Sequence, residues 1–159
     1  MHITIATVGK LRERYWDEAA KEYLKRLTRY AEVNVVEVTE EQAPETLSPA
    51  ERETVKAREG ERLLKQIRPD AHVIALVIDG KQLTSEGLSA HLADLSLHGQ
   101  GEVAIIIGGS LGLSPAVTTR AQLQLSFGKL TYPHQLMRVI LLEQVYRAFK
   151  IMRGEPYHK

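Results

Sequence analysis

Two near-continuous apolar runs constrain the fold of this chain more than any other feature. They are "AHVIALVID" at 71–79 and "EVAIIIGG" at 102–109, and both are rich in β-branched side chains. Such runs are typical of strands that are buried on both faces. Strand-like patterns also occur at His2–Val8, at Val33–Val38 and at the start of "LQLSFGKLTYPH", residues 123–134. Because helical patterns separate these strands, we predict an α/β fold with a mainly parallel sheet flanked by helices.

Helical periodicity fills the intervals between the predicted strands. An apolar residue recurs about every four positions from Leu11 to Tyr30, which marks one buried stripe on a helix. Ser48 is a good N-cap residue, and Pro49 suits the first position of a helix. We therefore predict helices at about 11–30 and 49–67, from about 85, from 115, and at 134–153. No repeat, low-complexity tract or linker interrupts this pattern, so residues 1–159 are expected to form a single domain.

The composition excludes several kinds of chemistry. The chain has no cysteine, so it has no disulfide, no thiolate nucleophile and no cysteine-bound metal. Its six histidines show no metal-ligand spacing, and we expect no metal. The apolar stretches are far shorter than a membrane span, and the N-terminus is typical of a strand rather than a signal peptide. We expect a cytoplasmic protein that does not contact a membrane.

The charge is unevenly distributed, although the net charge is only +1. Between Lys129 and Lys159, basic side chains outnumber acidic ones. Such a patch can meet RNA phosphates, but a solvated helix face gives the same pattern. The overall charge is too small for a protein that coats nucleic acid non-specifically.

Two loops follow predicted strands, where open α/β sheets bind their ligands. The first, "GGSLGLSP" at 108–115, has glycines that let the backbone turn sharply and approach a ligand closely. Its spacing fits neither a dinucleotide-binding motif nor a P-loop, and an ordinary strand-to-helix turn explains it equally well. The second loop, at 127–133, leads to His134, which either binds a ligand or only hydrogen-bonds near the helix start.

The final predicted helix and the tail behind it carry more apolar and aromatic residues than a chain end requires. Apolar residues lie outside the main apolar face, among basic side chains, at Leu136, Val139, Ile140 and Ile151. This pattern favours contact with a partner chain over burial inside one subunit. Gly154 and Pro156 stop the helix, and the tail "YHK" at 157–159 then places a phenol, an imidazole and an ammonium side by side.

Four blocks of this sequence resemble the ribosomal RNA large-subunit methyltransferase H family. They are "VGKLRERYW", "IGGSLGLSP", "LTYPHQLMRVILLEQVYRA" and the closing "YHK", and they span almost the whole chain. The resemblance implies a SPOUT-type fold with a C-terminal trefoil knot, and a homodimer. It also implies transfer of a methyl group from S-adenosylmethionine (SAM) to N3 of a pseudouridine in large-subunit (23S) ribosomal RNA, on the assembled ribosome.

The resemblance also implies which residues form the site. SAM would lie against Leu76, Gly108, Phe127, Gly128, Lys129, Leu130, Thr131 and Tyr132. The catalytic pair would be Tyr157 and His158, and the tail would complete the site of the partner subunit. His158 would either accept the N3 proton or only position the RNA. RNA phosphates would be held by Arg138, Arg153 and Lys159.

Three other functions remain open at the level of sequence. A SPOUT enzyme that methylates transfer RNA would accept naked transfer RNA. A non-catalytic ribosome-binding factor of the same fold would fail to bind SAM. A nucleotide-binding regulator is disfavoured by the glycine spacing and by the basic C-terminal region.

Overall fold

The computed structural model describes all residues from 1 to 159 and contains one five-stranded sheet. Every pair of neighbouring strands is parallel, and the strand order is β2-β1-β4-β3-β5. The strands are β1 (His2–Val8), β2 (Glu32–Val38), β3 (His72–Gln82), β4 (Glu102–Ile107) and β5 (Leu123–Ser126). The predicted α/β architecture with a parallel sheet is therefore confirmed.

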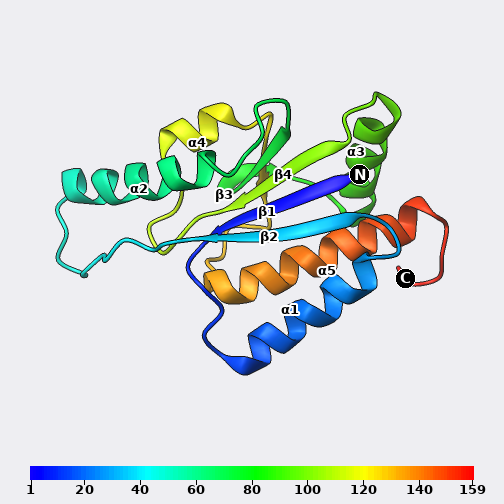
Figure 1. Ribbon diagram of the computed structural model, residues 1–159, viewed down its shortest axis with the longest axis horizontal. Coiled ribbons are helices and arrows are strands. Elements are labelled where there is room, and N and C mark those ends of the chain that lie inside the picture. The colour runs from blue at the N-terminus through cyan, green and yellow to red at the C-terminus, as the bar shows by residue number, and fades with distance from the viewer.

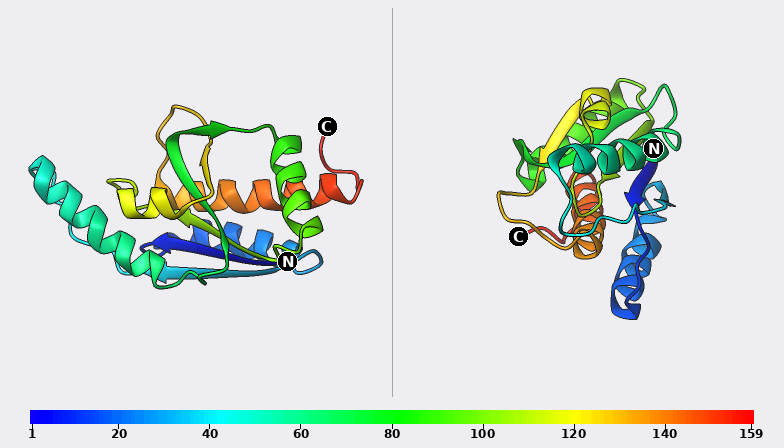
Figure 2. Two further views of the ribbon diagram at one scale, coloured as in Figure 1. Left: turned by 90° about the horizontal axis from the view of Figure 1, so that it is seen from above. Right: turned by 90° about the vertical axis from the view of Figure 1, so that its left-hand side faces the viewer.

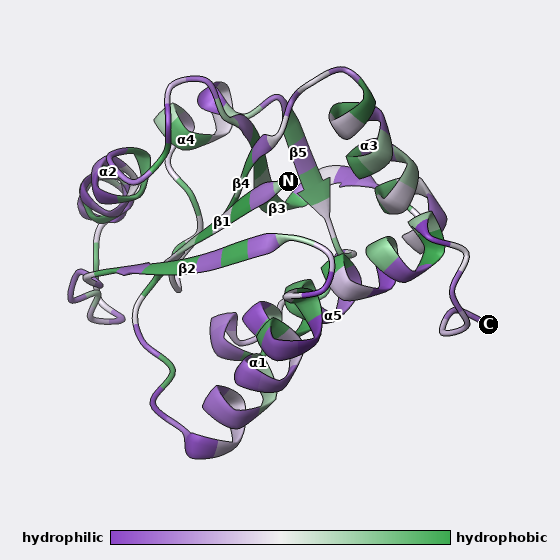
Figure 3. Cartoon of the chain, turned by 45° about the vertical axis from the view of Figure 1, so that its right-hand side comes forward, coloured by the Kyte–Doolittle hydropathy of each residue, from purple (hydrophilic) through white to green (hydrophobic).

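Five helices cover the two faces of the sheet (Figures 1 and 2). They are α1 (Arg14–Leu27), α2 (Pro49–Leu64), α3 (Ser85–Leu97), α4 (Pro115–Arg120) and α5 (His134–Met152). One core cluster joins α1, α3 and α5 to one face of the sheet, and a second joins α2 and α4 to the other. The inner strands are hydrophobic whereas α2 is largely hydrophilic, as expected for a helix at the solvent surface (Figure 3).

The alternation of side chains along β4 explains the two cores. Val103, Ile105 and Ile107 belong to the larger cluster, and Ala104 and Ile106 belong to the smaller one. Because successive side chains of a strand point to opposite faces, a strand covered on both sides must be apolar throughout. The continuous run in the sequence is the direct result of this burial.

Local capping signals fix where two helices begin. Ser48 and Glu51 form a reciprocal capping box, in which the Ser48 hydroxyl accepts from the Glu51 amide at 3.2 Å. The Thr84 hydroxyl accepts from the amide of Gly87 at 2.9 Å, at the start of α3. These starts agree with the sequence prediction.

Strand β3 continues to Gln82, three residues beyond the apolar run at 71–79. Its pairing with β5 shifts in register, so that both Leu76 and Lys81 lie opposite Leu125. A β-carbon on Gly80 would lie 2.7 Å from the carbonyl oxygen of Gln124, so only glycine allows the two strands to approach this closely.

Helix α5 is buried along one side and half-exposed along the other. Its buried side comprises Leu141, Leu142, Val145, Ala148 and Phe149. The apolar residues outside this side, Leu136, Val139, Ile140 and Ile151, are only half-buried. The partner chain that they indicate stays a prediction, as does the trefoil knot.

None of the helices combines the length and hydrophobicity that crossing a membrane requires.

Candidate functional site

A large pocket of about 800 Å³ lies beside β3, the C-terminal end of β4 and the loop that follows β5. Its wall includes most of the residues that the resemblance assigns to SAM, namely Leu76, Gly108, Phe127, Gly128, Leu130, Thr131 and Tyr132. Lys129 lies in the same loop but is exposed and does not line the pocket. Topology thus brings three separate segments of the chain together at one place.

The glycine loop after β4 makes a turn that side chains would prevent. A β-carbon on Gly108 would lie 2.9 Å from the carbonyl carbon of Gly112 and 3.0 Å from its oxygen. Gly112 has a φ of 88°, and its amide donates to the Gly109 carbonyl at 3.1 Å. The pocket wall here is therefore bare backbone, which can approach a ligand closely.

The second wall of the pocket is the loop at 127–132. The Gly128 amide donates to the Ser126 hydroxyl at 3.1 Å, and this hydroxyl donates to the Ile78 carbonyl at 2.6 Å. Gly128 has a φ of 112°, a conformation that favours glycine. Leu130 lies on the pocket wall with 73% of its surface exposed, so its side chain is accessible to a ligand.

The pocket fits SAM in its chemical character. Apolar side chains and backbone groups line most of it, and the two titratable side chains on its wall are Tyr132 and His134. Apolar walls can hold an adenine ring, and backbone amides and carbonyls can bond the polar parts of the donor. His134 lies both on this wall and at the first position of α5.

One residue behind the glycine loop, Glu59, was not predicted from the sequence. The carboxylate oxygens of Glu59 lie 3.1 and 3.3 Å from where a β-carbon of Gly109 would be. Glu59 is only 4% exposed, and this burial raises the pKa of its carboxyl group. The carboxylate accepts a hydrogen bond from the Glu41 amide at 3.1 Å. The adjacent Gly60 was the only available signal, since a glycine inside a helix often marks close packing.

The C-terminal tail folds back onto its own chain. Gly154 ends α5 with a φ of 64°, in accord with the predicted stop. The Tyr157 hydroxyl donates to Glu143 Oε1 at 3.0 Å, and the Arg147 guanidinium lies 4.6 Å from the centre of the tyrosine ring. Burial and the bond to Glu143 raise the pKa of Tyr157 to about 12. Its phenol is therefore neutral at physiological pH and serves as a hydrogen-bond donor.

His158 is also fixed by its own chain. Its Nε2 lies 2.9 Å from Glu86 Oε1, in the first turn of α3, and its Nδ1 lies 3.2 Å from Arg147 Nη1. The large pocket lies at the start of α5, whereas Arg147 follows His134 by thirteen residues, roughly 20 Å along the helix axis. The tail therefore does not enter the large pocket of its own chain.

The predicted RNA-binding residues differ in their surroundings. Arg153 and Lys159 are exposed, in accord with a contact to RNA. Arg138 is not available, because its side chain is buried and bonds Glu37 at 2.8 Å and the Gly9 carbonyl at 3.1 Å. The sequence places Arg138 among surface cations, and its partners lie more than 100 residues away along the chain.

Comparison with known proteins decides the family. A family model described as "Predicted SPOUT methyltransferase" matches residues 1–158. Proteins named ribosomal RNA large subunit methyltransferase H from Bifidobacterium adolescentis and Carboxydothermus hydrogenoformans are each 59% identical to this chain, over the full length of both chains. The chain belongs to this methyltransferase H family of SPOUT enzymes. The family that the sequence resembles is therefore confirmed.

Solved structures agree with the SPOUT methyltransferase fold. The alignment with a probable methylase family protein from Haemophilus influenzae spans 99% of this methyltransferase and 70% of that protein, with 12% identity and a TM-score of 0.55. The alignment with a methylase family protein from Neisseria gonorrhoeae spans 99% of this chain and 85% of that protein, with 13% identity and a TM-score of 0.52. The alignment with a methyltransferase from Legionella pneumophila, solved with bound SAM, spans 93% of this chain and 66% of that protein, with 13% identity and a TM-score of 0.50. At these identities the likeness concerns the fold alone.

Proposed function

We propose that this protein uses SAM to methylate N3 of a pseudouridine in large-subunit ribosomal RNA, acting on the assembled ribosome. The observation that carries the proposal is the full-length match to proteins named ribosomal RNA large subunit methyltransferase H, combined with a pocket that fits SAM. The localisation that suits this substrate is the cytoplasm.

The donor would be held by the large pocket. The backbone of Gly108 and the loop from Phe127 to Tyr132 would bind its polar parts, and Leu76 and Leu130 would contact the adenine. SAM supplies a methyl group that its sulfonium sulfur activates. The main contribution of the protein is alignment of donor and acceptor, which can lower a barrier by roughly 7–11 kcal/mol.

The tail would act on the acceptor nucleoside. N3 of the base carries a proton that must leave, and the imidazole of His158 is our candidate to accept it. Tyr157 stays protonated at neutral pH, so it would donate a hydrogen bond or stack on the nucleoside rather than act as a base. Arg153 and Lys159 would bind RNA phosphates next to the tail.

The active form would be a homodimer. The half-buried apolar residues along the outer side of α5 support an interface there, since water-exposed apolar surface favours burial. The tail is docked on its own α3 and α5, so pairing through α5 would present Tyr157 and His158 to the partner subunit. This arrangement would place the tail at the partner's donor pocket.

The experiment combines binding and transfer on the same variants. Calorimetry measures SAM affinity, and labelled methyl transfer is measured on intact ribosomes. We expect His158→Ala and Tyr157→Phe to bind SAM like the wild type but to lose most of the transfer. His98→Ala and Tyr15→Phe, at exposed positions elsewhere, are matched controls that should stay active.

Other outcomes would contradict this proposal. Efficient methylation of naked transfer RNA, with none on ribosomes, would indicate a different SPOUT enzyme. Failure of the wild type to bind SAM would indicate a non-catalytic factor. If His158→Ala keeps near wild-type turnover across the pH range, His158 is not the base. If sedimentation shows that the active form is a monomer, the site is not shared between subunits.

A further inference from the structure

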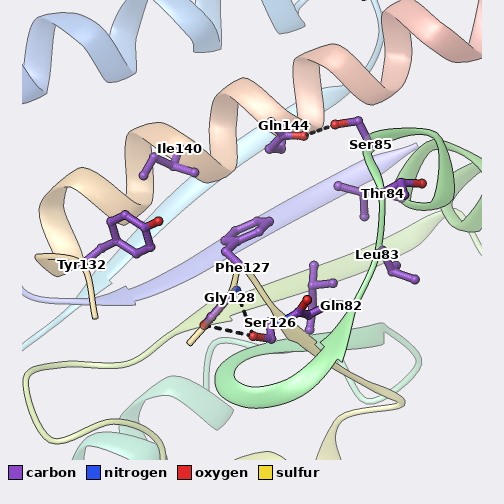
Figure 4. A pocket seen from close by; sticks show the side chains of 12 residues that line it. Gln82, Leu83, Thr84, Ser85, Ser126, Phe127, Gly128, Tyr132, Ile140 and Gln144 are labelled. Carbon is purple, nitrogen blue, oxygen red and sulfur yellow. Dashed lines mark hydrogen bonds between the residues drawn. The ribbon is translucent and has the colours of Figure 1, made fainter. Parts of the chain in front are cut away.

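A second, smaller pocket adjoins the donor pocket and has no role in the function described so far. Its volume is about 350 Å³, and it lies between the start of α3, the end of β5 and the middle of α5 (Figure 4). The two pockets share Leu125, Phe127, Gly128 and Tyr132 as a common wall. A molecule bound in the smaller pocket would therefore be a direct neighbour of a donor held by the loop at 127–132.

The lining of the smaller pocket is uncharged. Aliphatic and aromatic side chains, including Phe127 and Ile140, form one part, and carboxamides and hydroxyls form the rest. No side chain of this lining carries a charge, so the pocket offers hydrogen bonds and apolar contact rather than ion pairs. A neutral heterocycle with hydrogen-bonding edges matches this lining best.

The polar side of the pocket is held in a fixed orientation. The Ser85 hydroxyl donates to Gln144 Oε1 at 2.9 Å, and Gln144 Nε2 donates to Glu143 Oε2 at 2.9 Å. Each amide nitrogen has two hydrogens and each amide oxygen two lone pairs, so Gln144 keeps one donor and one acceptor position for a ligand. Figure 4 shows the Phe127 ring between this polar pair and the end of β5.

The same polar side connects to the tail. Glu143, which orients Gln144, also accepts the hydrogen bond of Tyr157 at 3.0 Å. Glu86, the residue after Ser85, holds His158 at 2.9 Å. The polar side of the smaller pocket is thus bonded, through Glu143 and the first turn of α3, to the tail of its own chain, which would itself serve the partner's site.

We propose that the smaller pocket is the binding site for the base of the acceptor nucleoside, a neutral pyrimidine. This inference rests on the proposed function and adds the part of the protein that recognises the substrate. The base stacks on Phe127, and the free donor and acceptor positions of Ser85 and Gln144 bond its carbonyl and N–H groups. The methyl carbon leaves the sulfonium sulfur and bonds to the ring nitrogen, and the proton of that nitrogen is released.

The test separates acceptor recognition from donor binding. The double variant Ser85→Ala/Gln144→Ala removes the polar pair, and Gln82→Trp fills part of the pocket from β3 without touching the donor pocket or the proposed interface on α5. Steady-state methyl transfer is measured against ribosome concentration, with SAM affinity, thermal unfolding and sedimentation measured in parallel. Ser96→Ala and Gln66→Ala, at exposed positions away from both pockets, are the matched controls.

We expect the double variant to lower kcat/KM for ribosomes at least tenfold, mainly through KM, while the Kd for SAM changes less than twofold. Gln82→Trp should lower kcat/KM by a similar factor in a protein of unchanged oligomeric state. If both folded variants keep kcat/KM within twofold of the wild type, the acceptor assignment is wrong and the proposed function stands. If the wild type itself transfers no methyl group to ribosomes, the proposed function fails and the acceptor assignment fails with it.

Discussion

A methyl group added at Gly108 tests whether the glycine loop shapes the donor pocket. In Gly108→Ala the new β-carbon would lie 2.9–3.0 Å from backbone atoms of Gly112, and 3.1 Å from Leu113 Cδ2. The side chain of a leucine can rotate away, but the backbone of the turn cannot move without opening the loop. Overpacking of this kind costs about 1–3 kcal/mol.

Gly101, at the other end of β4, provides a control. It directly precedes β4, whereas Gly108 directly follows it. A β-carbon on Gly101 meets nothing within 4 Å, and its φ is not positive. Gly101→Ala is therefore expected to be neutral or to stabilise the protein by up to about 1 kcal/mol, because alanine restricts the unfolded chain.

Two measurements check the prediction for Gly108→Ala. With a urea m-value of about 1–3 kcal/mol per M, a loss of about 2 kcal/mol lowers the midpoint of unfolding by roughly 1 M. Calorimetry should show that SAM binding weakens at least tenfold in the folded variant, because the loop is displaced. The reasoning is refuted if Gly108→Ala has the midpoint and SAM affinity of the wild type, or if Gly101→Ala is equally damaging.

Three further changes test other parts of the structure. Arg138→Met should destabilise the protein by about 1.5–3 kcal/mol in urea unfolding, because it leaves Glu37 without its partner, and adding Glu37→Gln should recover part of the loss. Burial lowers the pKa of His72 and of His91 from 6.5 in the folded protein. As the pH falls below 6.5, the unfolded chain therefore binds more protons than the folded protein, and the free energy of unfolding should drop between pH 7 and 5. His72→Gln/His91→Gln should flatten this dependence, and an unchanged slope would contradict the assignment. Burial raises the pKa of Glu59 from 4.5, so Glu59→Gln should stabilise the protein at pH 7 and progressively less toward pH 4.5 in the same assay; equal stability of the two proteins at pH 7 would contradict this.

Periodicity and capping predicted the fold well because both act over short distances along the chain. The apolar runs that became β3 and β4 are continuous because both faces of the sheet are covered. Ser48 bonds an amide three residues away, so its role as a helix cap was visible in the sequence. The continuation of β3 past Gly80 was missed, because it depends on the close approach of β5.

The parts of the site that sequence reasoning missed depend on contacts between distant segments. Arg138 lies in the basic C-terminal part of the sequence, and only the fold shows that it bonds Glu37 and Gly9. Glu59 was one charge among many on α2 until packing placed it against Gly109. The smaller pocket needs α3, β5 and α5 together, so no local motif could reveal it.

The methylated position gives the most direct test of the central claim. Ribosomes that lack the modification would be incubated with the purified protein and SAM, and the methyl group mapped by mass spectrometry of large-subunit RNA fragments. We predict one methyl group, on N3 of a single pseudouridine. A methyl group at another atom, on another RNA or on a ribosomal protein, or no transfer at all, would contradict the account.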